Sequence, residues 1–184
     1  ELKASPTVAP RGTVIESRLE QGRGVTATVL VRMGTLKPGQ AFICGNYYGK
    51  VKNLLNDQGK TIKQAGPSTP VQVLGFAGLP NAGDEFVVME SEKAAKALSD
   101  ERLATLRAEK LAVPKGGRTT LENLFASIAA DARKALRIIV KADMQGSLEA
   151  LVASLNDIES KKVDLDIIHS AVGPISESDV LLAS

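Results

Sequence analysis

The amino-acid sequence predicts an antiparallel β-barrel, followed by a helical connector and then a partial α/β/α domain with a parallel sheet. Two changes of pattern support this order. Short apolar segments first alternate at a period of two residues between turns, and a stretch rich in Ala, Leu, Glu, Lys and Arg then replaces them. Strand-like and helix-like segments alternate after that, as in β-α-β units. We therefore expect a barrel at residues 1–90, a connector at 91–118 and an incomplete α/β domain at 119–184.

The first expected element of the barrel is a β-hairpin whose turn is Gly22-Arg23-Gly24. After the turn, apolar residues recur at every second position, as in a half-buried strand. The predicted strands are 13–19, 25–31, 41–44, 47–55, 61–64, 70–74 and 85–89. Seven short strands with no helix between them favour a closed antiparallel barrel, because closure leaves no sheet edge exposed.

The connector is predicted as a helix over residues 91–112, because it consists of strong helix formers and places Glu92 four residues before Lys96. Residues 113–117 contain Pro and Gly and end this helix. A capping box that starts at Thr119 then predicts a second helix with an apolar face.

The last domain is expected to alternate strands and helices. We predict a strand at 136–142, a helix with Ser147 as its N-cap, a strand at 163–167 and a helix capped by Ser176. Two parallel strands do not complete a sheet that must be covered on both faces. We therefore expect an excised fragment, in agreement with a start at Glu1 rather than Met.

The sequence contains few residues of the kinds that form catalytic or metal-binding sites. Cys44 is the only cysteine, which excludes a disulfide and a thiolate metal cluster within the chain. His169 is the only histidine, so a metal site built from several histidines is excluded, and its place at the end of an apolar strand argues against a Ser-His-Asp triad. No phosphate-binding loop motif is present. We expect no catalytic residue, no metal site and no cofactor. We interpret His169 as a structural residue at a strand end, and residues 143–147 as a turn with a helix cap rather than an anion site.

Cys44 without a partner indicates a reducing compartment, and we expect a cytoplasmic protein. No apolar stretch approaches the ~20 residues that span a bilayer, so we expect no membrane partner.

The net charge of +2 is unevenly distributed. Residues 1–90 carry ten Lys and Arg against seven Asp and Glu, whereas residues 136–184 carry four against eight. Residues 91–135 carry nine Lys and Arg against six Asp and Glu, so an anionic polymer would meet the first two segments, 1–90 and 91–135, rather than the last one. The candidate phosphate contacts are the hairpin-tip Arg23 and the cations on outward strand positions: Arg18, Lys50 and Lys52. The alternative is a solvated surface whose charges serve solubility.

Several sequence strings carry a family resemblance. In the barrel region they are Arg11-Gly12-Thr13-Val14-Ile15-Glu16, Gly34-Thr35-Leu36-Lys37-Pro38-Gly39 and Ala65-Gly66-Pro67-Ser68-Thr69-Pro70. In the last domain they are Lys141-Ala142-Asp143-Met144-Gln145-Gly146-Ser147 and Ile168-His169-Ser170-Ala171-Val172-Gly173. These strings resemble the second and third domains of bacterial translation initiation factor two. The glycine-rich turn alone would indicate only the second-domain barrel of some translational GTPase. Gln40 and Pro174 depart from the family pattern at positions without chemistry.

The resemblance implies a ribosome-docking barrel that contacts rRNA of the small subunit, and a relay domain. It also implies that GTP and magnesium bind in a GTPase domain outside this chain, and that another module grips formylmethionyl initiator tRNA. The chain itself is then not an enzyme. Two alternatives stay open: a module of another translational GTPase, and a generic RNA-binding or structural spacer. Aromatic residues make up only 3% of the chain, which argues against recognition by base stacking.

Overall fold

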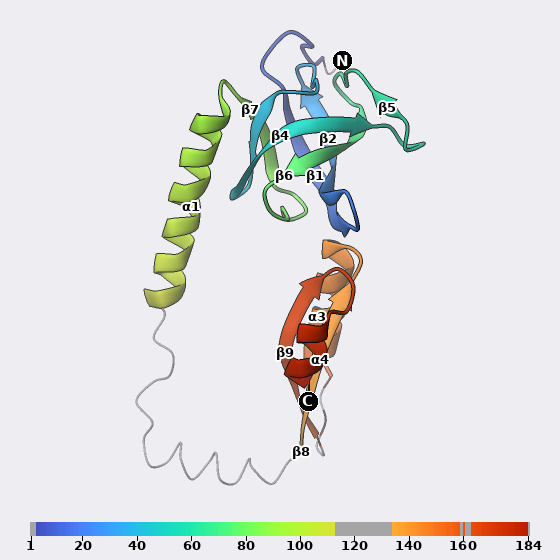
Figure 1. Cartoon of the computed structure of the whole chain (residues 1–184), viewed down its shortest axis with the longest axis vertical. Coiled ribbons are helices and arrows are strands. Elements are labelled where there is room, and N and C mark those ends of the chain that lie inside the picture. The colour runs from blue at the N-terminus through green and yellow to red at the C-terminus, as the bar shows by residue number, and fades with distance from the viewer. Residues whose placement is uncertain (1–2, 113–133, 159, 161–162, 184) are drawn as a thin grey trace.

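The computed structural model describes residues 3–112, 134–158, 160 and 163–183 (Figure 1). Seven strands come first: β1 (Arg11–Glu20), β2 (Gly24–Met33), β3 (Ala41–Cys44), β4 (Tyr47–Leu55), β5 (Thr61–Ile62), β6 (Pro70–Phe76) and β7 (Glu85–Met89). The rest comprises α1 (Glu92–Ala112), β8 (Lys134–Ala142), α3 (Gln145–Asn156), β9 (Val163–Val172) and α4 (Glu177–Ala183). The expected order of barrel, helix and parallel pair is thus confirmed.

The first seven strands build one antiparallel sheet in the order β3-β7-β1-β2-β6-β4-β5. A further pairing of β3 with β4 closes six of them into a barrel, and β5 pairs with β4. The strand predicted at 61–64 is shorter than expected, with only two residues in β5. Because the six-stranded ring is closed, each of its strands has a neighbour on both sides and no strand edge of the ring is left unpaired.

The strand register produces a row of buried residues that crosses four strands of the barrel. Ser17, Ala27, Val73 and Leu54 are paired across β1, β2, β6 and β4, and all four are almost completely buried. Phe42, Phe76 and Phe86 fill the barrel, with ring centroids of Phe42 4.7 Å from Phe76 and 4.5 Å from Phe86. The alternation read from the sequence therefore matches a single apolar interior.

Two glycines allow β4 and β6 to approach closely. A Cβ atom on Gly49 would collide with the carbonyl oxygen of Gly75 and come within 2.5 Å of Phe42 Cζ. Gly75 has a φ of 116°, and a Cβ there would collide with the carbonyl oxygen of Lys50. The pairing of β4 with β6 shifts register in this segment, which is the kind of bend that a small barrel needs to close.

Helix α1 begins after Ser91, whose hydroxyl accepts a hydrogen bond from the amide of Ala94 at 3.2 Å. Ala95 and Ser99 are buried against the barrel, and the Ser99 hydroxyl donates to the Asn46 carbonyl at 2.6 Å. Arg102 donates a further hydrogen bond to the carbonyl of Gly45. The first half of the helix is therefore fixed to the turn between β3 and β4.

Strands β8 and β9 pair in parallel, and α3 lies between them in sequence. Helix α4 begins with the predicted cap: the Ser176 amide and hydroxyl donate to Asp179 Oδ2 at 2.7 and 2.8 Å. Ser147 was wrongly predicted as the N-cap of α3, because the helix begins two residues earlier, after an extended Met144. His169 lies inside β9 rather than at its end, since the strand continues to Val172.

The helix predicted from Thr119 falls outside the described residues. In the part of the chain that the structure describes, none of the helices has the length and apolar character needed to cross a membrane.

Candidate nucleic-acid interface

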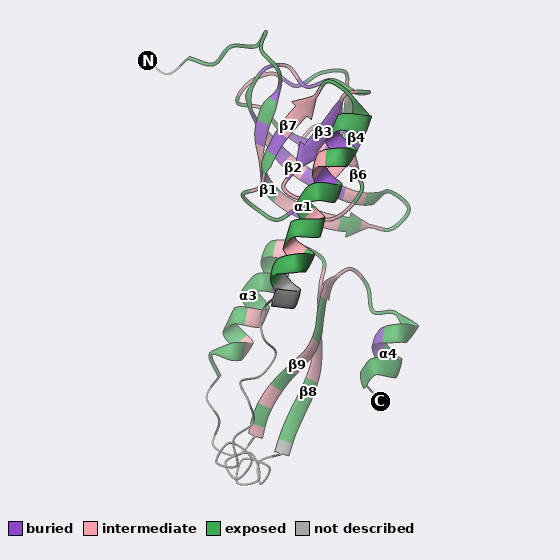
Figure 2. Ribbon diagram, turned by 90° about the vertical axis from the view of Figure 1, so that its left-hand side faces the viewer, coloured by how far each residue is buried: buried purple, intermediate pink, exposed green. Residues whose placement is uncertain are grey.

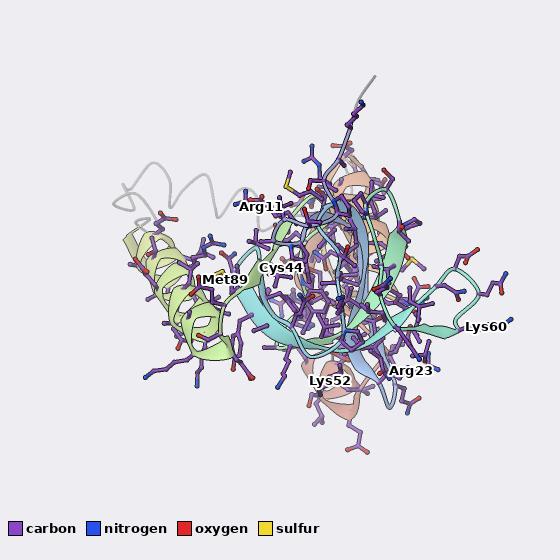
Figure 3. The ribbon with its side chains drawn as sticks, turned by 90° about the horizontal axis from the view of Figure 1, so that it is seen from above. Arg11, Arg23, Cys44, Lys52, Lys60 and Met89 are labelled. Carbon is purple, nitrogen blue, oxygen red and sulfur yellow. The ribbon has the colours of Figure 1, made fainter. Side chains whose placement is uncertain are left out.

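One register row across the barrel runs from Arg18 to the neighbour of Lys52. Arg18 of β1 is paired with Thr26 of β2, Thr26 with Leu74 of β6, and Leu74 with Asn53 of β4. Lys52 precedes Asn53, so three strand spacings, about 14 Å, separate the Arg18 and Lys52 ends of this row. In the view of Figure 3, Arg23 and Lys52 project from the same side of the barrel and Arg11 from the opposite side.

Lys50 and Lys52 are exposed, and Gly49 and Val51 between and beside them are buried. The predicted outward parity of the two lysines is therefore confirmed. Within the described residues, no carboxylate oxygen lies within 4.0 Å of either ammonium group. The Lys52 side chain starts over Gly75, where an added Cβ would lie 3.1 Å from Lys52 Cγ. Both cations are available to an anion from outside the chain.

Arg18 and Arg23 differ from the lysines because both bind the same carboxylate. Arg18 Nε lies 2.8 Å from Glu20 Oε1, and Arg23 Nη1 lies 3.3 Å from Glu20 Oε2. Gln72 Nε2 on β6 donates to Glu20 Oε1 at 2.8 Å, and the Thr26 hydroxyl lies 3.5 Å from the same oxygen. We call Arg18, Glu20 and Arg23 the hairpin clasp. It joins the strand and the turn of the β1–β2 hairpin.

The electrostatics of Glu20 follow from these contacts. Partial burial alone would raise the pKa of the Glu20 carboxyl. The hydrogen bond from Gln72 and the positive charges of Arg18 and Arg23 outweigh this effect and hold the pKa below its ordinary value. The hairpin clasp is therefore fully charged at neutral pH.

Sequence reasoning missed Glu20 and Gln72. The period-two rule places Glu20 on the face of Arg18, so the pair within β1 was accessible from spacing alone. Gln72 lies 52 residues away in sequence, and only the β2–β6 pairing brings it to the hairpin.

A groove of about 240 Å³ lies beside the hairpin clasp. Its lining includes two carboxylates, Glu16 and Asp57, together with Arg18, Asn56 and Gln72. Two acidic groups make this groove a poor phosphate site, so a polyanion would meet the raised cations rather than the groove.

The hairpin also contacts the α/β part of the chain. Arg18 and Met144 form an isolated antiparallel bridge, and a Cβ on Gly173 would lie 3.3 Å from Leu19 Cδ2. Leu19 and Ile175 line a cavity of about 440 Å³ between the two parts. Arg18 of the clasp and the adjacent Leu19 thus both contact the α/β part of the chain.

A second charged cluster lies within the α/β part. Lys141 Nζ is 3.1 Å from Asp179 Oδ2, and His169 Nε2 is 3.9 Å from Asp179 Oδ1. The hydrogen bonds from Ser176, together with Lys141, lower the pKa of Asp179 to about 2. This cluster fixes α4 to the parallel strands. Among the described residues, no three His, Cys, Asp or Glu side chains gather in a way that could hold a metal ion.

Comparison with known proteins divides the chain in two. Residues 9–89 match the family model described as elongation factor G domain 2, and residues 111–184 match the one described as translation-initiation factor 2. The whole chain is 50% identical to proteins named translation initiation factor IF-2 from Desulforapulum autotrophicum and Lactococcus lactis subsp. lactis, covering 18% and 19% of their lengths. A relative of that name from Caldanaerobacter subterraneus subsp. tengcongensis is 49% identical over the whole chain, which covers 26% of its length.

Among solved structures, GDP-bound aIF5B from Aeropyrum pernix aligns with 95% of this chain and 28% of its own, at 22% identity and a TM-score of 0.45. The chain spans about a fifth to a quarter of the length of the three relatives named above.

Proposed function

The chain belongs to the translation initiation factor IF-2 family, and from this premise we propose that its barrel docks on the small ribosomal subunit by binding rRNA phosphates. The observation that carries the proposal is the pair Lys50 and Lys52, exposed on a rigid strand with no carboxylate partner among the described residues. An ammonium group held in this way binds a phosphate without first giving up an internal ion pair.

The α/β part takes the role of a relay in this proposal. It contacts the barrel through Arg18 and Leu19, on the same strand that carries the hairpin clasp. A change at the docking surface therefore has a short path to residues 134–183. We propose the same domain division as above: barrel at 1–90, connector at 91–118 and α/β domain at 119–184.

In this proposal, GTP binding and hydrolysis take place in a part of the full-length factor outside this chain. The sequence contains no phosphate-binding loop motif, so we propose that this chain does not hydrolyse GTP. GTP with magnesium, and the delivery of formylmethionyl initiator tRNA to the ribosome, then belong to other parts of the full-length factor, which acts in the cytoplasm.

The test is co-sedimentation of this chain with isolated small ribosomal subunits across a salt series. We expect Lys50→Ala with Lys52→Ala to weaken binding and to reduce the slope of log affinity against log salt by about 0.7 to 0.9 for each lost phosphate contact. The barrel should remain folded, because both side chains point to solvent.

A matched control is Lys93→Ala with Lys96→Ala, which removes two exposed lysines from α1. Its binding and salt slope should stay close to those of the parent. Equal binding by both double variants would contradict the proposed docking surface, and a parent chain without salt-sensitive binding would favour the structural spacer.

A further inference from the structure

The hairpin clasp has a consequence for RNA binding. Resting on the proposed docking function, we propose that the Glu20 carboxylate is an internal competitor for the phosphate that Arg18 and Arg23 bind. Glu20 then limits the affinity of the hairpin for any phosphate backbone, and only an RNA surface that also engages other parts of the barrel displaces it.

The geometry supports competition rather than a distant charge effect. Glu20 uses both carboxylate oxygens, one for Arg18 at 2.8 Å and one for Arg23 at 3.3 Å. Its side chain is 19% exposed, whereas those of Arg18 and Arg23 are 38% and 58% exposed. The carboxylate therefore sits beneath two accessible guanidinium groups. A phosphate that approaches from solvent finds the arginines, but part of their donor capacity is already used.

Glu20 cannot easily turn away from this position. Gln72 donates to Oε1 at 2.8 Å, and the buried Thr26 hydroxyl lies 3.5 Å from the same oxygen. These contacts hold the carboxylate in place from below while the arginines cover it. When a phosphate takes an arginine, it must share the guanidinium with Glu20 or leave the carboxylate without that partner.

The salt dependence of binding follows from the same arrangement. A cation without an internal partner releases a full counterion from the nucleic acid when it binds a phosphate. A cation taken from a carboxylate leaves an anion behind that recruits a counterion, which offsets part of this release. We therefore expect Arg18 and Arg23 to contribute less to the salt slope than Lys50 and Lys52.

Glu20→Gln tests the proposal, because it removes the charge and keeps the length of the side chain and its contact with Gln72. We expect this variant of the full 184-residue chain to bind small ribosomal subunits roughly threefold to tenfold more tightly than the parent. The slope of log affinity against log salt should steepen by up to about 0.7 to 0.9 for each released arginine.

The matched control is Glu16→Gln on the same face of the same strand. Glu16 accepts a hydrogen bond from Thr28 at 3.2 Å, and within the described residues no Lys or Arg nitrogen lies within 4.0 Å of it. Both substitutions change the net charge equally, so the difference between them isolates the clasp. Glu20→Asp keeps the charge on a shorter side chain and should fall between the parent and Glu20→Gln.

Arg18→Ala with Arg23→Ala separates this inference from the proposed function. If that variant binds as the parent does, the hairpin contact itself is wrong. If it binds more weakly, and Glu20→Gln binds no more tightly than Glu16→Gln, the docking function stands and competition by Glu20 is overturned. Weaker binding by Glu20→Gln would show that the carboxylate orients the arginines instead. Thermal melts of each variant confirm that folding is retained.

Discussion

The barrel and the α/β part of this chain bury their apolar residues to very different extents. The barrel contains a continuous buried cluster that includes Val29, Phe42, Leu54 and Val73. In the described residues of the α/β part, only Val140, Leu148 and Asp179 are buried. Figure 2 shows this contrast as a concentration of buried segments in the barrel and mainly exposed or intermediate ones in β8, β9, α3 and α4.

The difference is one of closure rather than of composition. Each strand of the ring has two paired neighbours, so alternate residues point into a shared interior. Strands β8 and β9 form a two-stranded parallel sheet, and parallel sheets are normally covered on both faces. Large apolar side chains in this part remain open to solvent: Leu136 is 52% exposed, Ile175 73% and Leu181 76%. Similar apolar strings therefore stabilise the two regions unequally.

Matched leucine substitutions should give the largest difference in stability between the two regions. Leu54→Ala should destabilise the barrel by about 3 to 5 kcal/mol, because Leu54 is completely buried and the closed ring cannot collapse around the cavity. Leu148→Ala should leave the barrel transition unchanged. Both tyrosines of the chain lie in β4 and there is no Trp, so tyrosine fluorescence during urea unfolding reports on the barrel alone. Equal shifts for the two variants would mean that the regions unfold as one unit.

Amide hydrogen exchange measures the local stability of the two regions without mutation. Strand β2 is paired on both sides, with β1 and β6, whereas β9 is paired with β8 in the described residues. Amides of Val25–Val31 should therefore exchange at least about tenfold more slowly than those of Val163–Ile167. Equal protection would show that the α/β part is as stable as the barrel.

The smallest expected effect is a pH-dependent loosening of α4. The pKa of Asp179 is lowered to about 2 from its ordinary value of 3.8, chiefly by hydrogen bonds from Ser176 and also by Lys141. Its stabilising contribution is therefore fully present above about pH 4 and is lost as the pH falls through about 2. The amide NMR chemical shifts of residues 177–183 should change between pH 5 and pH 2 as this contribution is lost. The amide chemical shifts of β2 should not change with it. In the Asp179→Asn variant, the part of this pH dependence that comes from Asp179 should be absent.

Much of the fold was predictable from local pattern. The hairpin and the boundaries of the strands at 41–44 and 47–55 follow from alternation and glycine turns, and the start of α1 follows from the change to strong helix formers. The start of α3 was not predictable in this way, because Ser147 is a good capping residue that lies inside the helix without capping it. The length of β5 also depended on its pairing with β4 rather than on its own sequence.

For the candidate interface, the outward direction of the two lysines could be predicted from sequence alone. A period of two residues fixes the side of a strand on which Lys50 and Lys52 lie, and that local geometry holds in the structure. Which of the candidate cations lack an internal carboxylate partner among the described residues became clear from the tertiary contacts. Arg18 and Arg23 look equivalent to the lysines along the chain, yet Glu20 binds both, and Gln72 from β6 holds Glu20 in place. Charge availability depends on contacts between strands brought together by barrel closure, and side-chain periodicity carries no information about those contacts.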